Sequence, residues 1–249
     1  MADEKTPFTS HLDELRKRII ICIVAVAAGF LGSYCFAEQI FDILVKPLKA
    51  ELPPDSMLIF TGLPEAFFVY LKLSLFGGII LAIPVILWEI WCFTAPGLYD
   101  REKKYAYPFV IFSTVFFATG VSFGYFVVFP IAFKFFMGYS SDLIKAMPSV
   151  KEYLTFSCKL LLAFGVVFEL PLFILFLAKI GLVNDKMLRS KRKFAILGIF
   201  ALAAVLTPPD VVSQILMALP LLILYEIGIL VAKFFGKKEE KEEEEEEEK

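Results

Sequence analysis

Histidine, cysteine pairs and glycine-rich loops are scarce in this chain of 249 residues. His11 is the only histidine, and the four cysteines form no CxxC pair. Metal sites and thiol redox centres need clusters of these side chains, so we expect no metal and no cofactor. There is also no internal repeat, no glycine-rich phosphate loop and no polar stretch long enough for a soluble domain, which argues against nucleotide hydrolysis.

Apolar residues are abundant instead. They make up 58% of the chain, with 28 Phe and a mean hydropathy of +0.72, whereas soluble domains contain about 45–50% apolar residues. Much of this apolar surface must therefore face lipid. The formal net charge of −2 arises at the end of the chain, because nine of the 27 acidic residues lie between positions 239 and 248. The rest of the chain is mildly basic.

The apolar runs predict an all-α, polytopic integral membrane protein with six transmembrane helices. A helix needs about 20 residues to cross a hydrocarbon core about 30 Å thick. Four clear runs cover residues 19–36, 67–93, 107–136 and 154–180. Two more, 194–206 and 211–235, are separated by Thr207-Pro208-Pro209-Asp210 and are interpreted as a short helical hairpin. The run at 19–36 is too long for a signal-peptide core of about 7–15 residues, so it is expected to stay uncleaved.

Basic residues near the helix ends predict the orientation, because Lys and Arg favour the cytoplasmic side. They cluster before the first run, between the second and third, between the fourth and fifth, and after the sixth. Both termini are therefore expected in the cytoplasm. We divide the chain into a membrane domain, 1–236, and an acidic tail, 237–249, which should be disordered because like charges repel and bury nothing.

Three acidic positions stand out on the residues alone. Glu14 lies in the amphipathic segment 11–18, where Arg18 is four residues away and can form an ordinary helix ion pair with it. Glu102 lies in the basic loop 95–104, where balancing its neighbours is an equally simple role. Glu169 lies deep in an apolar run, where an ionisable group is costly and usually faces protein or water. Pro171 beside it should kink the helix.

Other positions carry weaker signals. Asp210 follows two prolines and either caps the next helix or has a function. Glu226 lies near the end of the last run, and Pro84 should kink the second run. Pro47 is expected to form a rigid bend in the first outer loop.

A midplane acid beside a kink also fits an ion-coupled secondary transporter of a small solute, although the chain has no internal repeat or paired broken helices. An intramembrane enzyme is disfavoured, since no Ser/His pair, paired Asp or His cluster is present.

The motifs resemble the TatC family, which belongs to the twin-arginine protein translocase. They occur in the family's order and cover nearly the whole chain: HLDELRKR at 11–18, KPL at 46–48, PVILWEIWCFTAPGLYDREKK at 84–104, YFVVFPIAF at 125–133, AFGVVFELP at 163–171, LTPPDVVSQ at 206–214 and LYEIG at 224–228.

This resemblance implies six helices in a concave cup, with the last two short, in a bacterial cytoplasmic membrane. It implies a receptor, not an enzyme, that binds twin-arginine signal peptides of folded proteins. Export would need TatA and TatB partners, several copies per complex and the proton-motive force, and no nucleic acid.

The resemblance also assigns roles to individual positions. It implies signal-peptide binding by Glu14, Glu102, Arg16 and Phe93, and roles in transport or assembly for Pro47, Glu169 and Asp210. Two positions depart from a common form of the family: Glu89 stands where Gln is frequent, and Asp100 where a basic residue is frequent. Asp100 makes the receptor loop more acidic.

Overall fold

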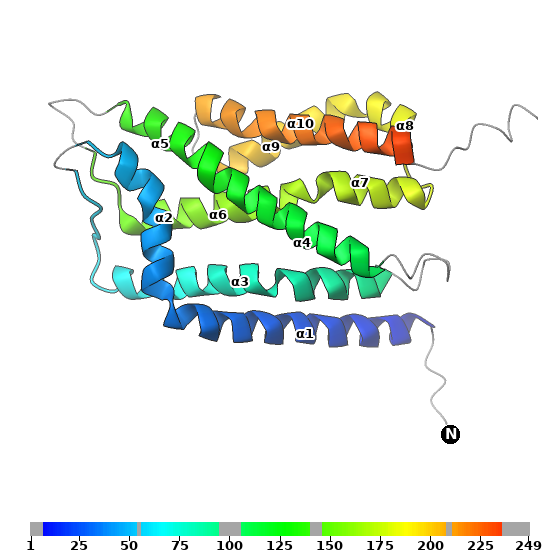
Figure 1. Cartoon of the computed structure of the whole chain (residues 1–249), viewed down its shortest axis with the longest axis horizontal. Helices are drawn as coiled ribbons and strands as arrows, with labels where there is room; N and C mark the ends of the chain where they lie inside the picture. Colours follow the sequence, from blue (N-terminus) through cyan, green and yellow to red (C-terminus); the bar gives the residue numbers. More distant parts are fainter. Residues whose placement is uncertain (1–6, 54–55, 95–105, 140–145, 208–210, 236–249) are drawn as a thin grey trace, which may run out of the picture. The chain divides into compact units, whose positions relative to one another are not determined.

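The computed structural model describes residues 7–53, 56–94, 106–139, 146–207 and 211–235, and these are helical almost throughout (Figure 1). The only β-pairing among them is one parallel bridge between Ile59 and Ser149. The chain divides into two compact units, Met1–Leu162 and Ala163–Lys249. The predicted all-α membrane fold is thus confirmed for the described residues.

In the first unit, α1 (Pro7–Cys35) packs side by side with α3 (Glu65–Thr94) (Figure 1). Glycines allow the two backbones to touch. A Cβ at Gly78 would lie 2.5 Å from the backbone nitrogen of Phe30, and one at Gly29 would lie 2.7 Å from the carbonyl oxygen of Gly78. Small residues permit this approach between membrane helices, where no hydrophobic force drives helices together.

The segment between α1 and α3 contains a helix, α2 (Ala37–Glu51), and Pro47 lies inside it. The predicted bend at Pro47 is therefore wrong. Proline lacks the N–H that would bond the carbonyl four residues earlier, at Ile43. The hydroxyl of Tyr125 donates to that carbonyl at 2.7 Å, and the hydroxyl of Tyr153 donates to the next one, at Leu44, at 2.5 Å. Because the Tyr125 hydroxyl supplies the donor that Pro47 lacks, the helix continues through its proline.

The third predicted span is one continuous rod of three helical segments: α4 (Ala106–Phe123), the π-helical turn η3 (Gly124–Val128) and α5 (Phe129–Met137). The π turn ends two residues before Pro130, which cannot donate to the α-helical acceptor at Phe126. Tyr125 belongs to this turn, so the irregular backbone presents the hydroxyl that binds α2.

Two connecting segments of the first unit are joined through Glu65, a buried carboxylate at the start of α3. Its Oε2 accepts from the backbone and hydroxyl of Thr61 and from the backbone of Gly62. Its Oε1 accepts from the Ser149 hydroxyl at 2.8 Å and from the Lys151 backbone at 3.0 Å. The carboxylate therefore connects the segment before α3 to the segment that begins α6 (Val150–Phe168).

In the second unit, α6 ends at Phe168 and α7 (Leu170–Lys179) begins after Glu169. This break confirms the kink predicted from Pro171. The helix α7 is capped by Ile180, and Gly181 follows with a φ of 80°, which suits a residue without a Cβ. The short α8 (Asp185–Ser190) begins with the Asn184 side chain accepting from the Met187 backbone at 2.7 Å.

The closing helices are α9 (Arg192–Leu206) and α10 (Val211–Phe235), and α10 packs against both α7 and α9. Five helical stretches of the described residues are long and apolar enough to cross a membrane: His11–Cys35, Glu65–Phe93, Tyr107–Met137, Val150–Lys179 and Val211–Phe235. With 15 residues, α9 spans only about 22 Å.

The prediction of two short closing helices thus holds for α9 alone, because α10 has 25 residues. The count of six crossings and the side of each terminus remain predictions.

Candidate functional site

The amino end of α1 lies beside the carboxyl end of α3, because the two packed helices run in opposite directions (Figure 1). On α1, His11, Glu14 and Arg18 share one face, since their spacings of three and four residues match the helical repeat. On α3, Glu89 and Phe93 are likewise four residues apart. The antiparallel pair brings these two faces together.

Arg18 bridges one carboxylate on each helix. Its Nε and Nη2 donate to Oε1 of Glu14 at 3.1 and 2.5 Å, and its Nη1 donates to Oε2 of Glu89 at 3.0 Å. The side chains differ in exposure: 35% for Glu14, 23% for Arg18 and 11% for Glu89. Glu89 is therefore the inner acid, for which a cationic partner is essential at such burial, and Glu14 is the outer one.

Two stacked aromatic pairs lie near this end of α3. His11 stacks on Phe93 with ring centroids 4.6 Å apart and an interplanar angle of 25°. Trp91 stacks on Phe109 of α4 at 4.5 Å, which ties the same end of α3 to its next neighbour. Phe93, which the motif match assigned to the site, thus contacts His11, one helical turn before Glu14 on α1.

The cluster has an excess of negative charge. Glu14 and Glu89 carry two negative charges against the single positive charge of Arg18, while Arg16 is two residues from both Glu14 and Arg18 and so points to the opposite side of α1. Arg16 is exposed there. A surface of this kind suits a cationic ligand, above all a guanidinium group, which carboxylates bind through paired hydrogen bonds.

The other assigned residues lie elsewhere. Pro47 belongs to α2, and Glu169 lies at the break between α6 and α7, with a buried Oε1. Glu102, Asp100 and Asp210 fall outside the described residues. The structure therefore brings together Glu14 and Phe93 of the assigned binding residues, and leaves Arg16 on another face.

The sequence did not predict the roles of two acids on α3: Glu89, which pairs with Arg18, and Glu65, which accepts hydrogen bonds from the segment before α6. The sequence marked Glu89 only as an unusual residue, and it did not mark Glu65. Their contacts join residues 71 and 84 positions apart, which no local spacing reveals. In the second unit, Glu226 pairs with Arg192 at 2.8 Å, so this acid has a structural partner.

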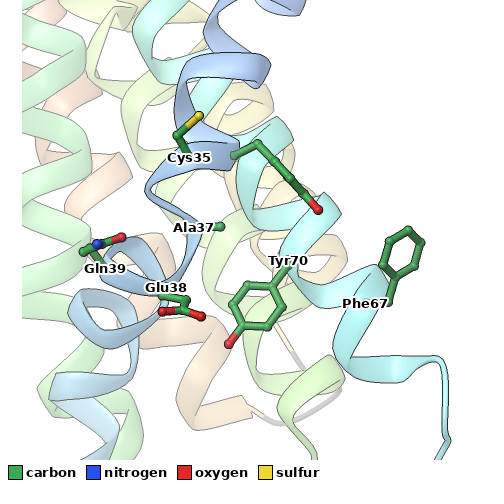
Figure 2. A pocket seen from close by; sticks show the side chains of 7 residues that line it. Cys35, Ala37, Glu38, Gln39, Phe67 and Tyr70 are labelled. Carbon is green, nitrogen blue, oxygen red and sulfur yellow. The ribbon is translucent and has the colours of Figure 1, made fainter.

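A separate cavity of about 440 Å³ opens at the other end of α1. Tyr34 and Cys35 from α1, Glu38 from α2 and Tyr70 from α3 are among the residues that line it. In Figure 2 the side chains of Glu38 and Tyr70 point toward each other. Because about 20 helical residues, or about 30 Å, separate Tyr34 from Glu14, this cavity is distinct from the carboxylate cluster.

Comparison with known proteins identifies strong similarities. Residues 10–220 match the model of a family described as Sec-independent protein translocase protein (TatC). The chain is 58% identical to a protein of that name from Desulforapulum autotrophicum, over 95% of this chain and 88% of the relative. It is 39% identical to the one from Escherichia coli, over 95% of this chain and 92% of the relative.

Solved structures agree with these sequence matches. A crystal structure of the twin-arginine translocase receptor TatC superposes with a TM-score of 0.82 at 40% identity, covering 89% of this chain and 97% of that one. A second crystal structure, of the same receptor in DDM, gives a TM-score of 0.83 at 40% identity and covers 90% of this chain and 100% of that one. These matches give no support to a small-solute transporter.

Proposed function

Because this chain belongs to the TatC family of Sec-independent protein translocase proteins, we propose that it is the receptor subunit of a twin-arginine translocase. The family is a translocase component and not a known enzyme. In this proposal the chain binds the signal peptides of folded proteins without covalent catalysis. It passes them on with TatA-like and TatB-like single-span partners, in several copies, at the expense of the proton-motive force.

The observation that carries this proposal is the anionic cluster at the start of α1. Glu14 is about one-third exposed, shares Arg18 with the inner acid Glu89 and lies one helical turn after His11, which stacks on Phe93. A guanidinium offers several N–H groups in a fixed plane, whereas the ammonium of lysine is a point charge. A receptor that uses carboxylates can therefore prefer an arginine pair to a lysine pair.

The resemblance adds Glu102 to the binding residues, and also Arg16, which lies on another face of α1. We place this end of α1 on the cytoplasmic side of the bacterial inner membrane, with both termini cytoplasmic. The apolar part of the signal would then lie along exposed apolar residues of α1, which continue from the cluster into the membrane and include Ile19, Ile23 and Val24. Pro47, Glu169 and Asp210 would act in assembly or transport and not in recognition.

Passage of the folded protein would use local thinning of the bilayer near the 15-residue α9. A helix shorter than the hydrocarbon core is accommodated by thinning the bilayer, at modest cost. Lengthening α9 by two turns should therefore reduce transport while leaving signal binding intact. Undiminished transport in that variant would contradict the thinning step.

Crosslinking tests the receptor proposal directly. A photoreactive twin-arginine signal peptide is presented to membranes that contain this protein and its partners, next to the same peptide with two lysines. Glu14→Gln and Glu102→Gln should each abolish the arginine-specific crosslink, because an amide oxygen accepts a weaker hydrogen bond than a carboxylate oxygen.

Glu38→Gln is the matched control, since Glu38 is an exposed acid at the far end of the same helix pair. This variant should crosslink like the unaltered protein. Crosslinks that ignore both the arginine pair and the two acids would refute the receptor proposal.

A further inference from the structure

The guanidinium of Arg18 already occupies the carboxylate that the proposed function assigns to the signal peptide. Two of its nitrogens donate to Glu14, and both bonds end on the same oxygen, Oε1. The third contact, from Nη1, goes to Glu89. The protein thus holds an arginine of its own in the position where a ligand arginine should bind.

We infer that Arg18 is an internal competitor of the twin-arginine motif, and that Glu89 holds Arg18 when the signal peptide displaces it from Glu14. This inference rests on the proposed function, since it concerns access to the same carboxylate. It assigns Arg18 and Glu89 as residues that set specificity, in addition to Glu14.

The bonding geometry favours displacement by another guanidinium. A ligand guanidinium can place two parallel N–H bonds on both oxygens of a carboxylate, which is the strongest arrangement of this pair. Arg18 uses one oxygen of Glu14 only. A lysine ammonium lacks the fork, so it should fail to displace Arg18 even though its charge is the same.

Burial determines where Arg18 remains after displacement. The Glu89 side chain is 11% exposed and that of Glu14 is 35% exposed, so leaving Glu89 without a cation would be the more costly change. When a ligand takes Glu14, Arg18 keeps its bond to the inner acid, and no buried charge loses its partner. A neutral residue at position 89 would remove this support and strengthen the dependence of Arg18 on Glu14.

Three variants of the full chain, in membranes with its partners, test the inference through the dissociation constants of the Arg-Arg and Lys-Lys peptides. Arg18→Lys keeps the charge but loses the fork, so the Arg-Arg peptide should bind about 3- to 10-fold tighter, and the preference over Lys-Lys should shrink. Glu89→Gln should bind the Arg-Arg peptide about 3- to 10-fold more weakly.

The double variant Arg18→Gln/Glu89→Gln removes competitor and inner acid together without leaving a buried charge, and it should bind at least as tightly as Arg18→Lys. It also keeps the test decisive if a single variant fails to fold. Weaker or unchanged Arg-Arg binding in the folded Arg18 variants would overturn the inference. That result is expected if Arg18 only holds Glu14 in position and does not compete with the peptide for it.

The failure of the proposed function gives a different pattern. If the unaltered protein does not distinguish the two peptides, the receptor proposal itself is wrong. If Glu14→Gln loses binding while the Arg18 and Glu89 variants match the unaltered protein, the receptor proposal stands and the competition is refuted.

Discussion

The contact between α1 and α3 can be tested at Gly78, where a single methyl group would meet the backbone of α1. An ideal Cβ there lies 2.5 Å from the nitrogen and 2.9 Å from the Cα of Phe30, and 3.0 Å from the carbonyl carbon of Gly29. Favourable contacts between such atoms lie at about 3.5–4.0 Å. Backbone cannot relieve the overlap by changing rotamer, so the helices must separate by roughly 1 Å.

Gly78→Ala should therefore lower the free energy of unfolding by about 1–3 kcal/mol, the range found when extra atoms are forced into a well-packed core. Gly32→Ala is the matched control, since Gly32 lies on α1 and a Cβ there meets nothing within 4 Å. Both substitutions gain the same helix propensity, about 0.8–1 kcal/mol, so their difference isolates the contact. Gly78→Ala should melt about 2–12 °C below Gly32→Ala.

The assay is thermal unfolding of the two variants in the same detergent, followed by peptide binding. Separation of the helices would also weaken the bond between Arg18 and Glu89, which lies 11 residues beyond Gly78 on the same interface. Equal melting temperatures for the two variants would refute the claim that backbone contact holds α1 against α3.

Three further predictions concern other sites. Glu65→Gln should lower the melting temperature and make the two segments that Glu65 joins easier to proteolyse, because an amide NH₂ would face donors that now meet a carboxylate oxygen. Glu38→Gln, at an exposed acid, should change neither property. Tyr125→Phe should lower the free energy of unfolding by about 0.5–1.5 kcal/mol. The loss should be smaller in a Pro47→Ala background, where the restored N–H of residue 47 donates to the Ile43 carbonyl. Strictly additive effects in this double-mutant cycle would contradict the view that Tyr125 replaces the donor missing at Pro47. Glu169→Gln should slow transport without loss of signal binding, and normal transport would exclude an obligatory charge there.

Local chemistry allowed much of the fold to be predicted. Runs of about 20 apolar residues predict crossings because lipid offers no hydrogen-bond partners to an unpaired backbone, and five such helices are present in the described residues. The break at Glu169 was also predictable, since Pro171 acts on the turn of helix that contains it. The motifs named the family, and with it Glu14 and Phe93.

Prediction from neighbouring residues was wrong where a residue distant in the sequence supplied a missing hydrogen-bond donor. Pro47 alone indicates a bend, but Tyr125 donates to the carbonyl that the proline leaves open, 82 positions away, and α2 continues. The residues close to Pro47 in the sequence do not predict this contact with the Tyr125 hydroxyl.

The sequence by itself determined which long apolar segments form helices that can cross a membrane and which family the chain resembles, because length, hydropathy and motif order are properties of continuous segments. Only the tertiary structure decided that α2 is a helix, that Arg18 bridges Glu14 and Glu89, and that Glu65 joins two connecting segments. Those pairings depend on the antiparallel packing of α1 against α3 and on the meeting of distant loops. Hydrogen bonds act over about 3 Å in space, whatever the separation along the chain.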